Sequence, residues 1–327
     1  MNLNNCCDAP DHCLLTLAEA LTTAMHSILP IGETETVPLL AANGRILAAD
    51  RLAQFDAPPH DNSAMDGFAL HHADLKPDQP TRLPVVGQAL AGHPYPRIVP
   101  RGAAVRITTG GLIPNGPNTV VMQEHCYIAP DEHWIELAAP ITARLRVGEN
   151  IRRRGEDVRS GTVLLSSGLQ LRPQDIALAA GQGIAALTVI RRLRVAVAST
   201  GDELYVPGME LPPGAIYESN RYILMGLLNA LGCTVTDLGI LRDDQAVLRS
   251  ALRDAAATHD VLLTSGGVSA GTADLVKTVI AELGTIEFWR LAVKPGKPVM
   301  FGRIQECLVL GLPGNPVSVM VSFLMFA

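Results

Sequence analysis

The segment 264–274, TSGGVSAGTAD, has the residue types of an anion-binding corner. It follows the apolar run 261–263, which predicts a buried strand, and precedes an apolar stripe with helical spacing. A glycine turn between a strand and a helix presents free backbone N–H groups and the positive end of the helix dipole to one point. Asp274 adds a carboxylate, which suits Mg²⁺ better than a bare phosphate. The segment therefore predicts a site for a phosphorylated ligand carried with Mg²⁺.

Two further corners place acids directly after predicted strands. They are the segment 199–203, STGDE, and the pair Asp243-Asp244. The carboxyl ends of parallel strands meet at one edge of a sheet, so Glu203, Asp243 and Asp274 are expected to converge as oxygen ligands of Mg²⁺. The simpler interpretation of each acidic pair is a helix N-cap. No Gly-Lys-Ser/Thr follows the glycine turn, so P-loop ATPase chemistry is not indicated.

The segment 294–298, KPGKP, supplies fixed positive charge. Its two lysines, Lys294 and Lys297, stand three residues apart on a turn stiffened by proline, which leaves little entropy to lose on binding. This suits an oxyanion or a pyrophosphate, and the alternative is a pair of solvated lysines. The turn 313–316, PGNP, is a further anion-type corner of lower specificity.

Three polar segments lie outside this group. They are 61–67, DNSAMDG, 108–111, TTGG, and 152–157, RRRGED. Taken alone, the first and the last are best interpreted as salt-bridged surface loops, and the middle one as a turn.

The elements that must position the corners alternate from residue 190 onward. This pattern predicts a mostly parallel sheet with helices on both faces, and ligands bind such sheets outside the carboxyl ends of the strands. The predicted strands are 193–198, 233–240, 260–264, 286–293 and 307–312, and the predicted helices are 220–231, 244–257, 273–283 and one from 316.

The first half of the chain has a different pattern. Residues 11–29 predict a helix capped by Asp11 and ended by Pro30. Residues 56–150 contain short alternating apolar runs broken by Pro, Gly and Asn, which is typical of a β-rich unit. One further helix is predicted over 173–180.

Composition excludes several classes of protein. The 327 residues are 48% apolar and 18% charged, which fits a folded protein with sizeable cores. A net charge of −6 without a broad basic face argues against nucleic-acid binding. We see no signal peptide and no apolar run of about 18 residues, so no complete membrane span is expected. The scattered cysteines favour a reducing cytoplasm. Cys6, Cys7 and Cys13 cluster near His12, but we interpret them as a reduced, non-functional tail rather than a metal site.

Six motifs in this order resemble those of the molybdopterin molybdenumtransferase family, to which a domain of gephyrin also belongs. The motifs are DNSAMDG at 61–67, NIRRRGED at 150–157, STGDEL at 199–204, SGGVSAG at 265–271, KPGKP at 294–298 and GLPGNPVS at 311–318.

The resemblance implies Mg²⁺-dependent insertion of molybdate into adenylylated molybdopterin, with release of AMP, as the final step of molybdenum cofactor biosynthesis. It implies catalytic roles for Asp66, Asp157, Glu203, Lys294 and Lys297, and metal binding by Asp243, Asp274 and Glu203. The substrate-binding residues that it implies are Thr109, Arg152, Thr200, Gly201, Ser265, Gly266, Gly267, Ser269, Pro295, Gly296, Pro298, Gly314 and Asn315.

The resemblance also implies the architecture, an elongated multidomain chain in which a β-rich domain is inserted and a three-layer α/β domain follows. The expected parts are a flexible leader (1–10), a linker and dimerisation domain (11–55 and 151–190), the β-rich domain (56–150) and the α/β molybdopterin-binding domain (191–327). It further implies a homodimer with its active site in a cleft between subunits, and the molybdopterin adenylyltransferase and apo-molybdoenzymes as partners.

The C-terminal end of the sequence and the function each allow more than one interpretation. The helix from residue 316 is apolar up to Ala327 and has no capping residue, so we expect the chain to be truncated before the small C-terminal β domain of the family. The start of a membrane helix is the alternative interpretation. Two other functions compete with the transferase: a pterin-binding or scaffold module with impaired catalysis, and a different nucleotide hydrolase on the same α/β domain, against which the motifs of the β-rich half argue.

Overall fold

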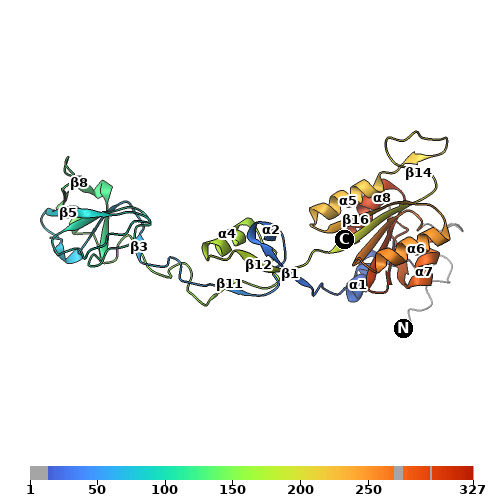
Figure 1. Ribbon diagram of the computed structural model, residues 1–327, viewed down its shortest axis with the longest axis horizontal. Helices are drawn as coiled ribbons and strands as arrows, with labels where there is room; N and C mark the ends of the chain where they lie inside the picture. Colours follow the sequence, from blue (N-terminus) through green and yellow to red (C-terminus); the bar gives the residue numbers. More distant parts are fainter. Residues whose placement is uncertain (1–13, 269–274, 295–296, 327) are drawn as a thin grey trace. The chain divides into compact units, whose positions relative to one another are not determined.

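The computed structural model describes residues 14–268, 275–294 and 297–326, and the chain divides into two compact units (Figure 1). The first unit consists of Met1–Glu35 and Ile190–Ala327, and the second of Thr36–Val189. No helix in the described ranges has both the length and the apolar character needed to cross a membrane.

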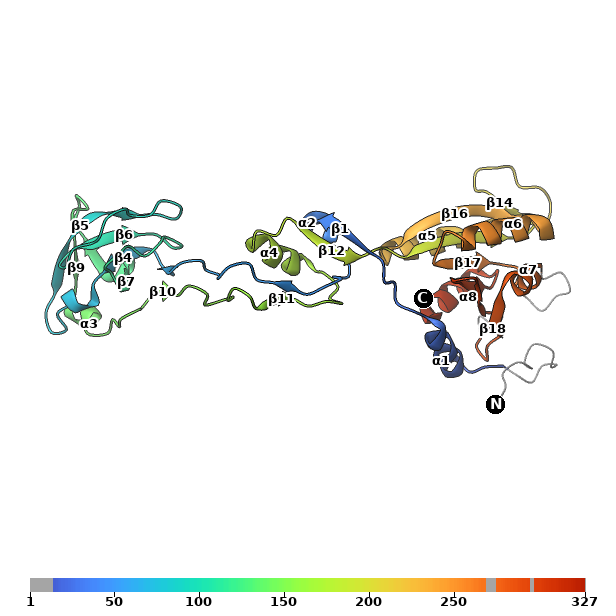
Figure 2. The same cartoon turned by 60° about the horizontal axis from the view of Figure 1, so that its bottom comes forward.

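The first unit is built on a six-stranded sheet, of which β16, β17 and β18 are labelled in Figure 2. The strand order is β16-β13-β17-β20-β19-β18. Neighbours among the first four strands pair in parallel, and β18 and β19 join antiparallel at the far edge. The strands are β13 (Arg194–Thr200), β16 (Thr234–Leu241), β17 (Val261–Ser265), β18 (Thr285–Trp289), β19 (Met300–Ile304) and β20 (Cys307–Leu312).

Helices cover both faces of this sheet. The helices are α1 (Leu17–Ser27), α5 (Asn220–Ala230), α6 (Gln245–Ala256), α7 (Leu275–Leu283) and α8 (Pro316–Phe326). Successive residues of a strand point to opposite faces. In β13, Ala196 and Ala198 therefore pack into the core with α6 and α7, whereas Val195 and Val197 pack into the core with α1, α5 and α8. The unit is thus the three-layer α/β domain that the alternating pattern predicted.

Three local predictions need correction. Helix α1 begins at Leu17 rather than near Asp11, which lies outside the described residues. Thr16 caps α1 through a capping box, in which its hydroxyl accepts from Glu19 N–H at 3.3 Å and Glu19 Oε2 accepts from Thr16 N–H at 2.8 Å. The strand predicted over 286–293 ends at Trp289, because Arg290 takes a left-handed conformation (φ 78°) that interrupts an extended strand. Strand β19 was not predicted.

The second unit contains the β-rich sheet, of order β7-β4-β6-β5-β9-β8, in which only β5 and β6 pair in parallel. Its strands are β4 (Gly67–Leu70), β5 (Thr81–Ala89), β6 (Ala104–Ile107), β7 (Thr119–Met122), β8 (Cys126–Ile128) and β9 (Trp134–Leu137). Strand β4 is buried on both faces. In β4, Phe68 and Leu70 belong to one core and Ala69 to the other.

The remainder of the second unit consists of paired short strands and two helices around a core of its own. Antiparallel pairs join β2 (Arg51–Leu52) to β11 (Val163–Leu165) and β3 (Asn62–Ser63) to β10 (Ile151–Arg152). A further pair is β1 (Thr34–Pro38) with β12 (Ala186–Ile190), and the helices are α2 (Leu39–Ala42) and α4 (Pro173–Gly181). Helix α4 matches the helix predicted over 173–180.

Candidate functional site

The glycine turn after β17 has the backbone that its sequence indicated. Gly266 and Gly267 both adopt left-handed conformations, with φ of +90° and +66°. A Cβ on Gly266 would lie 2.5 Å from the Thr200 carbonyl oxygen, and one on Gly267 would lie 2.9 Å from Thr200 Oγ1. The corners after β13 and β17 are therefore in contact, and only glycine fits between them. Thr200 is 4% exposed, and its hydroxyl has no hydrogen-bond partner among the described residues.

The turn after β20 joins the same group. Gly266 N–H donates to the Leu312 carbonyl at 3.0 Å, and a Cβ on Gly314 would lie 4.0 Å from the Gly266 Cα. Asn315 Oδ1 accepts from Val317 N–H at 3.0 Å and from Ser318 N–H at 3.2 Å, so this side chain caps α8. Three of the predicted corners thus meet at the carboxyl edge of the sheet.

A buried polar network that the sequence analysis missed lies beneath these corners. It comprises Glu218, Asn220 and Arg221 at the start of α5, which are 2%, 8% and 7% exposed. Glu218 Oε1 accepts from Ser199 Oγ at 2.8 Å, and Asn220 Nδ2 donates to Ser265 Oγ at 2.7 Å. The available signal was the run of four polar residues, 218–221, in front of an apolar helix. Such a run is expensive to bury unless every group is paired.

The acids of the second and third corners lie beside one another. Asp243 N–H donates to Asp202 Oδ1 at 3.3 Å, and Arg242 donates to the Asp202 carbonyl at 2.6 Å. Partial burial, with the negative charges of Asp202 and Glu203, raises the pKa of Asp243. Asp244 is the N-cap of α6, accepting from Val247 N–H at 2.9 Å, so the simpler interpretation holds for that residue.

A metal site is not completed by these acids alone. Within the described ranges, no three His, Cys, Asp or Glu side chains are grouped so that they could hold an ion. Asp274, the third predicted ligand, lies outside the described residues, as do Ser269, Pro295 and Gly296. The hard oxygen donors of Glu203 and Asp243 suit Mg²⁺, and further ligands are required to hold it.

Gly201 and the two lysines complete the predicted residues of this unit. Gly201 (φ +146°) brings Glu203 back toward the corner, since a Cβ there would lie 2.5 Å from Glu203 Oε2. Lys294 and Lys297 are exposed, Pro298 is half-buried, and the Lys297 carbonyl accepts from Leu291 N–H at 2.8 Å.

In the second unit, Asp66 and Thr109 form a pair. Asp66 Oδ1 accepts from Thr109 N–H at 2.7 Å and from Thr109 Oγ1 at 3.0 Å, and these hydrogen bonds lower the pKa of Asp66. Backbone hydrogen bonds from Ser63 N–H to Gly111 O at 2.9 Å and from Gly110 N–H to Ser63 O at 2.8 Å bring the DNSAMDG and TTGG segments together. An ionised carboxylate is therefore held on a fixed turn.

The RRRGED segment lies next to DNSAMDG through the β3–β10 pairing. Its three arginines are all paired: Arg152 with Asp157, Arg153 with Asp61 at 2.6 Å, and Arg154 with Asp56 at 2.6 Å. This is the salt-bridged loop that the motif alone predicted. The Arg152–Asp157 ion pair also raises the pKa of Arg152.

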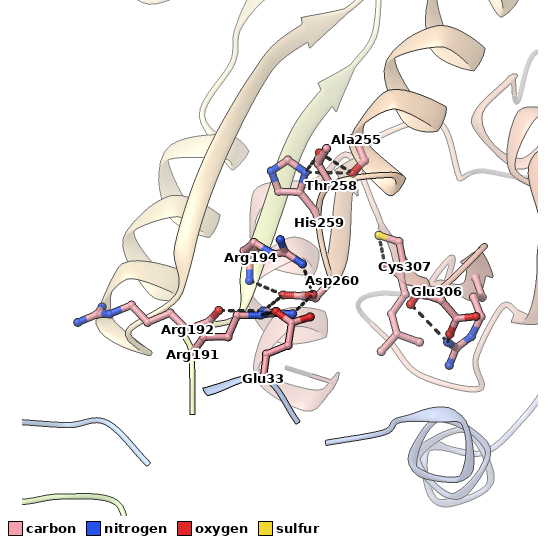
Figure 3. A network of polar contacts seen from close by, with 12 residues as sticks. Glu33, Arg191, Arg192, Arg194, Ala255, Thr258, His259, Asp260, Glu306 and Cys307 are labelled. Carbon is pink, nitrogen blue, oxygen red and sulfur yellow. Dashed lines mark hydrogen bonds and ion pairs between the residues drawn. The ribbon is translucent and has the colours of Figure 1, made fainter. Parts of the chain in front are cut away.

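A separate cavity of about 620 Å³ lies at the opposite end of the parallel strands in the first unit. Residues at the starts of β13, β17 and β20 line it, among them Val195, Val261 and Leu308. Beside it, Arg191 pairs with Asp260 and with Glu33, and Arg194 also donates to Asp260 (Figure 3). Its lining contains none of the glycine corners, lysines or acids described above, so we assign it no part in the candidate site.

The fold and the corners define the class of the protein. An open α/β sheet with polar, glycine-rich turns at the carboxyl ends of its strands has its ligand site at that edge. Here this domain is joined in one chain to a unit carrying further acidic and basic motifs, which is the arrangement of a multidomain α/β enzyme.

Comparison with known proteins gives the family. The model described as "MoeA N-terminal region (domain I and II)" matches residues 15–183, and the model "Probable molybdopterin binding domain" matches residues 196–327. A Haemophilus influenzae protein named molybdopterin molybdenumtransferase is 42% identical over 95% of this chain and 75% of its own length. A Nostoc protein of the same name is 38% identical over 90% of this chain and 68% of its own length.

A solved structure agrees with these relatives. The crystal structure of the molybdopterin biosynthesis moeA protein from Pyrococcus horikoshii superimposes with a TM-score of 0.81 at 33% identity, over 96% of this chain and 77% of that one. The chain belongs to the molybdopterin molybdenumtransferase family and is an enzyme of this type.

Proposed function

We propose that this enzyme inserts molybdenum from molybdate into adenylylated molybdopterin and releases AMP in a reaction that requires Mg²⁺. The observation that carries the proposal is the meeting of the corners after β13, β17 and β20, where Gly266 and Gly267 lie against Thr200. Glycine turns of this kind present to phosphate oxygens those backbone N–H groups that are not already bonded, as Gly266 N–H is to the Leu312 carbonyl. The pyrophosphate of an adenylylated pterin has that chemistry.

Two sets of charged groups would have different roles at this edge of the sheet, the acids as metal ligands and the lysines as an anion site. Glu203, Asp243 and Asp274 would hold Mg²⁺, which neutralises phosphate charge when bound. Lys294 and Lys297 would attract molybdate, a dianion, because fixed cations offset the repulsion between molybdate, phosphate and carboxylates. Asp66, Thr109, Arg152 and Asp157 would act from the second unit.

The test is a turnover assay with the purified chain. Adenylylated molybdopterin and molybdate are supplied with and without Mg²⁺, and released AMP is measured by chromatography. We expect AMP release that depends on both molybdate and Mg²⁺. Tight binding of adenylylated molybdopterin without AMP release would contradict the enzymatic proposal for this chain and favour a pterin-binding module.

We also propose that the protein acts as a homodimer in the cytoplasm. The cytoplasmic assignment is supported by Cys126, Cys233 and Cys307, which are free thiols, as expected in a reducing compartment. A molybdopterin adenylyltransferase would supply the substrate and apo-molybdoenzymes would accept the product. Both interactions can be tested by co-purification with this chain.

A further inference from the structure

Three residues of the segment 218–221 contact all four parallel strands of the α/β sheet or the turns that follow them. Glu218 accepts from Ser199 Oγ of β13 at 2.8 Å, and Arg221 Nη1 donates to both carboxylate oxygens of Asp237 in β16, at 2.7 and 2.8 Å. Asn220 Nδ2 donates to Ser265 Oγ, at the end of β17, and to the Gly314 carbonyl, after β20, both at 2.7 Å. The start of α5 therefore links the carboxyl ends of β13 and β17 and the turn after β20, and it is also paired with the middle of β16.

The orientation of the Asn220 amide follows from its partners. The Gly314 carbonyl can only accept a hydrogen bond, so the nitrogen of the amide must face it. Both N–H groups are then used, by Gly314 and by Ser265. The remaining atom, Asn220 Oδ1, is buried and has no hydrogen-bond partner among the described residues.

Two polar atoms at this junction thus lack hydrogen-bond partners within the part of the chain that the structure describes. One is Asn220 Oδ1, an acceptor, and the other is Thr200 Oγ1, which can donate. The two residues are 8% and 4% exposed. A buried polar atom without a partner destabilises the folded chain, and a ligand or an ordered water that bonds it removes that cost. Their location beside Gly266, Gly267 and Gly314 indicates that the ligand of the glycine corners meets them.

We propose that Asn220 is a positioning residue that holds the corners after β17 and β20 at the spacing needed by a pyrophosphate-bearing ligand. Its amide N–H groups join Ser265 to Gly314, and the Gly266 turn lies between these two strand ends. The identity of that ligand rests on the proposed function, whereas the positioning role rests on the contacts alone.

The test is Asn220→Asp, which preserves the size of the side chain but removes both N–H donors. A carboxylate would face the Gly314 carbonyl, so the two corners should separate. We expect the KM for adenylylated molybdopterin to rise about tenfold or more, while the molybdate concentration for half-activity changes less than about twofold. The matched control is Asn229→Asp, at an exposed position on the same helix, which should leave both values unchanged.

A purely structural role would lower kcat and shift both substrate dependences together with the melting temperature. That pattern, or an unchanged KM in a folded Asn220→Asp enzyme, would overturn the inference. If Asn220→Asp fails to fold, Ser265→Ala removes one of the two N–H contacts with less disruption. It should raise the same KM by a smaller factor, and the inference is also overturned if that KM is unchanged.

Binding of inorganic pyrophosphate, measured by calorimetry, separates this inference from the proposed function. If the wild-type chain binds pyrophosphate without releasing AMP from adenylylated molybdopterin, the proposed reaction fails. About tenfold weaker pyrophosphate binding by Asn220→Asp would then still support the positioning role. Suppose instead that the wild type is active and that Asn220→Asp and Ser265→Ala bind pyrophosphate as tightly as the wild type does. The positioning role then fails and the proposed reaction stands.

Discussion

Lys294 is the residue whose charge we expect to matter most for molybdate. It is exposed in the segment between β18 and β19. Within that segment Leu291 N–H donates a hydrogen bond to the Lys297 carbonyl. Lys294→Gln preserves approximate length but removes the charge. We expect the molybdate concentration for half-activity to rise about tenfold, equivalent to roughly 1.4 kcal/mol. Titrating molybdate against AMP release checks this, with Lys76→Gln as the exposed control in the other unit. A normal molybdate dependence with weakened pterin binding would reassign Lys294 to the phosphates.

A substitution at Gly267 tests whether the glycine turn after β17 requires a residue without a side chain. A Cβ at Gly267 would lie 2.4 Å from Val276 Cγ2 and 2.9 Å from Thr200 Oγ1, and φ is +66°. Gly267→Ala should destabilise the first unit by about 1–3 kcal/mol and weaken pyrophosphate binding. Gly214→Ala is the matched control, since φ there is +86° but no atom lies within 4 Å of the added Cβ. If both variants lose equal binding, the close contact at Gly267 is not the cause.

At the scale of elements, the Asp260 carboxylate at the start of β17 binds Arg191 and Arg194, at the end of the sheet away from the corners. It accepts from Arg191 Nη1 at 2.6 Å, from Arg191 Nη2 at 2.8 Å and from Arg194 N–H at 2.7 Å, and Arg191 also pairs with Glu33 (Figure 3). Partial burial alone would raise the pKa of Asp260. The hydrogen bonds from Arg191 and Arg194 outweigh this and lower its pKa from 3.8 to about 2.

A depressed carboxyl pKa contributes stability that is fully present above the unfolded-state pKa and is lost as pH falls through the folded-state pKa. Between about pH 4 and pH 2, this network should therefore lose roughly 2 kcal/mol of its contribution to the free energy of unfolding. Denaturant unfolding of the first unit at several pH values measures the loss. Asp260→Asn should flatten the profile in that window, whereas Asp254→Asn, at an exposed site, should not. An unchanged profile for Asp260→Asn would refute the assignment.

At the scale of the whole molecule, the predicted site residues divide between the two units. Asp66, Thr109, Arg152 and Asp157 belong to one, whereas Glu203, Asp243 and the lysines belong to the other. The proposed homodimer would allow the two sets to serve one site from different subunits. Light scattering at micromolar concentration should give the mass of a dimer, and a monomer alone would contradict the proposal.

Complementation tests whether subunits share sites. Asp66→Asn and Lys294→Gln chains are mixed and refolded together, and activity is assayed at limiting molybdate, where each variant by itself is inactive or weak. If each site uses both subunits, random pairing should restore about a quarter of wild-type activity, since half of the dimers are mixed and one of their two sites is intact. If each site lies within one chain, no activity returns.

The amino-acid order by itself determined the α/β layering and the positions of the corners. The continuous apolar run of β13 buries side chains on both faces of the strand, which few elements other than a covered parallel strand can do. The glycines of the β17 turn and the N-cap at Asp244 are equally local signals, because each depends on a few neighbouring residues. Motif resemblance then indicated the family, which the comparisons confirm.

Tertiary structure decided which polar residues meet. Asn220 joins Ser265, 45 positions away, to Gly314, 94 positions away, and no periodic pattern encodes such a pairing. The start of α1 shows the same limit, because the choice of Thr16 as cap depends on where Ala20 and Ala24 can pack against the sheet. Periodicity reports which side of an element is apolar. The partner across a core is selected only when the chain is packed, since burial of a polar group requires a matching group from elsewhere.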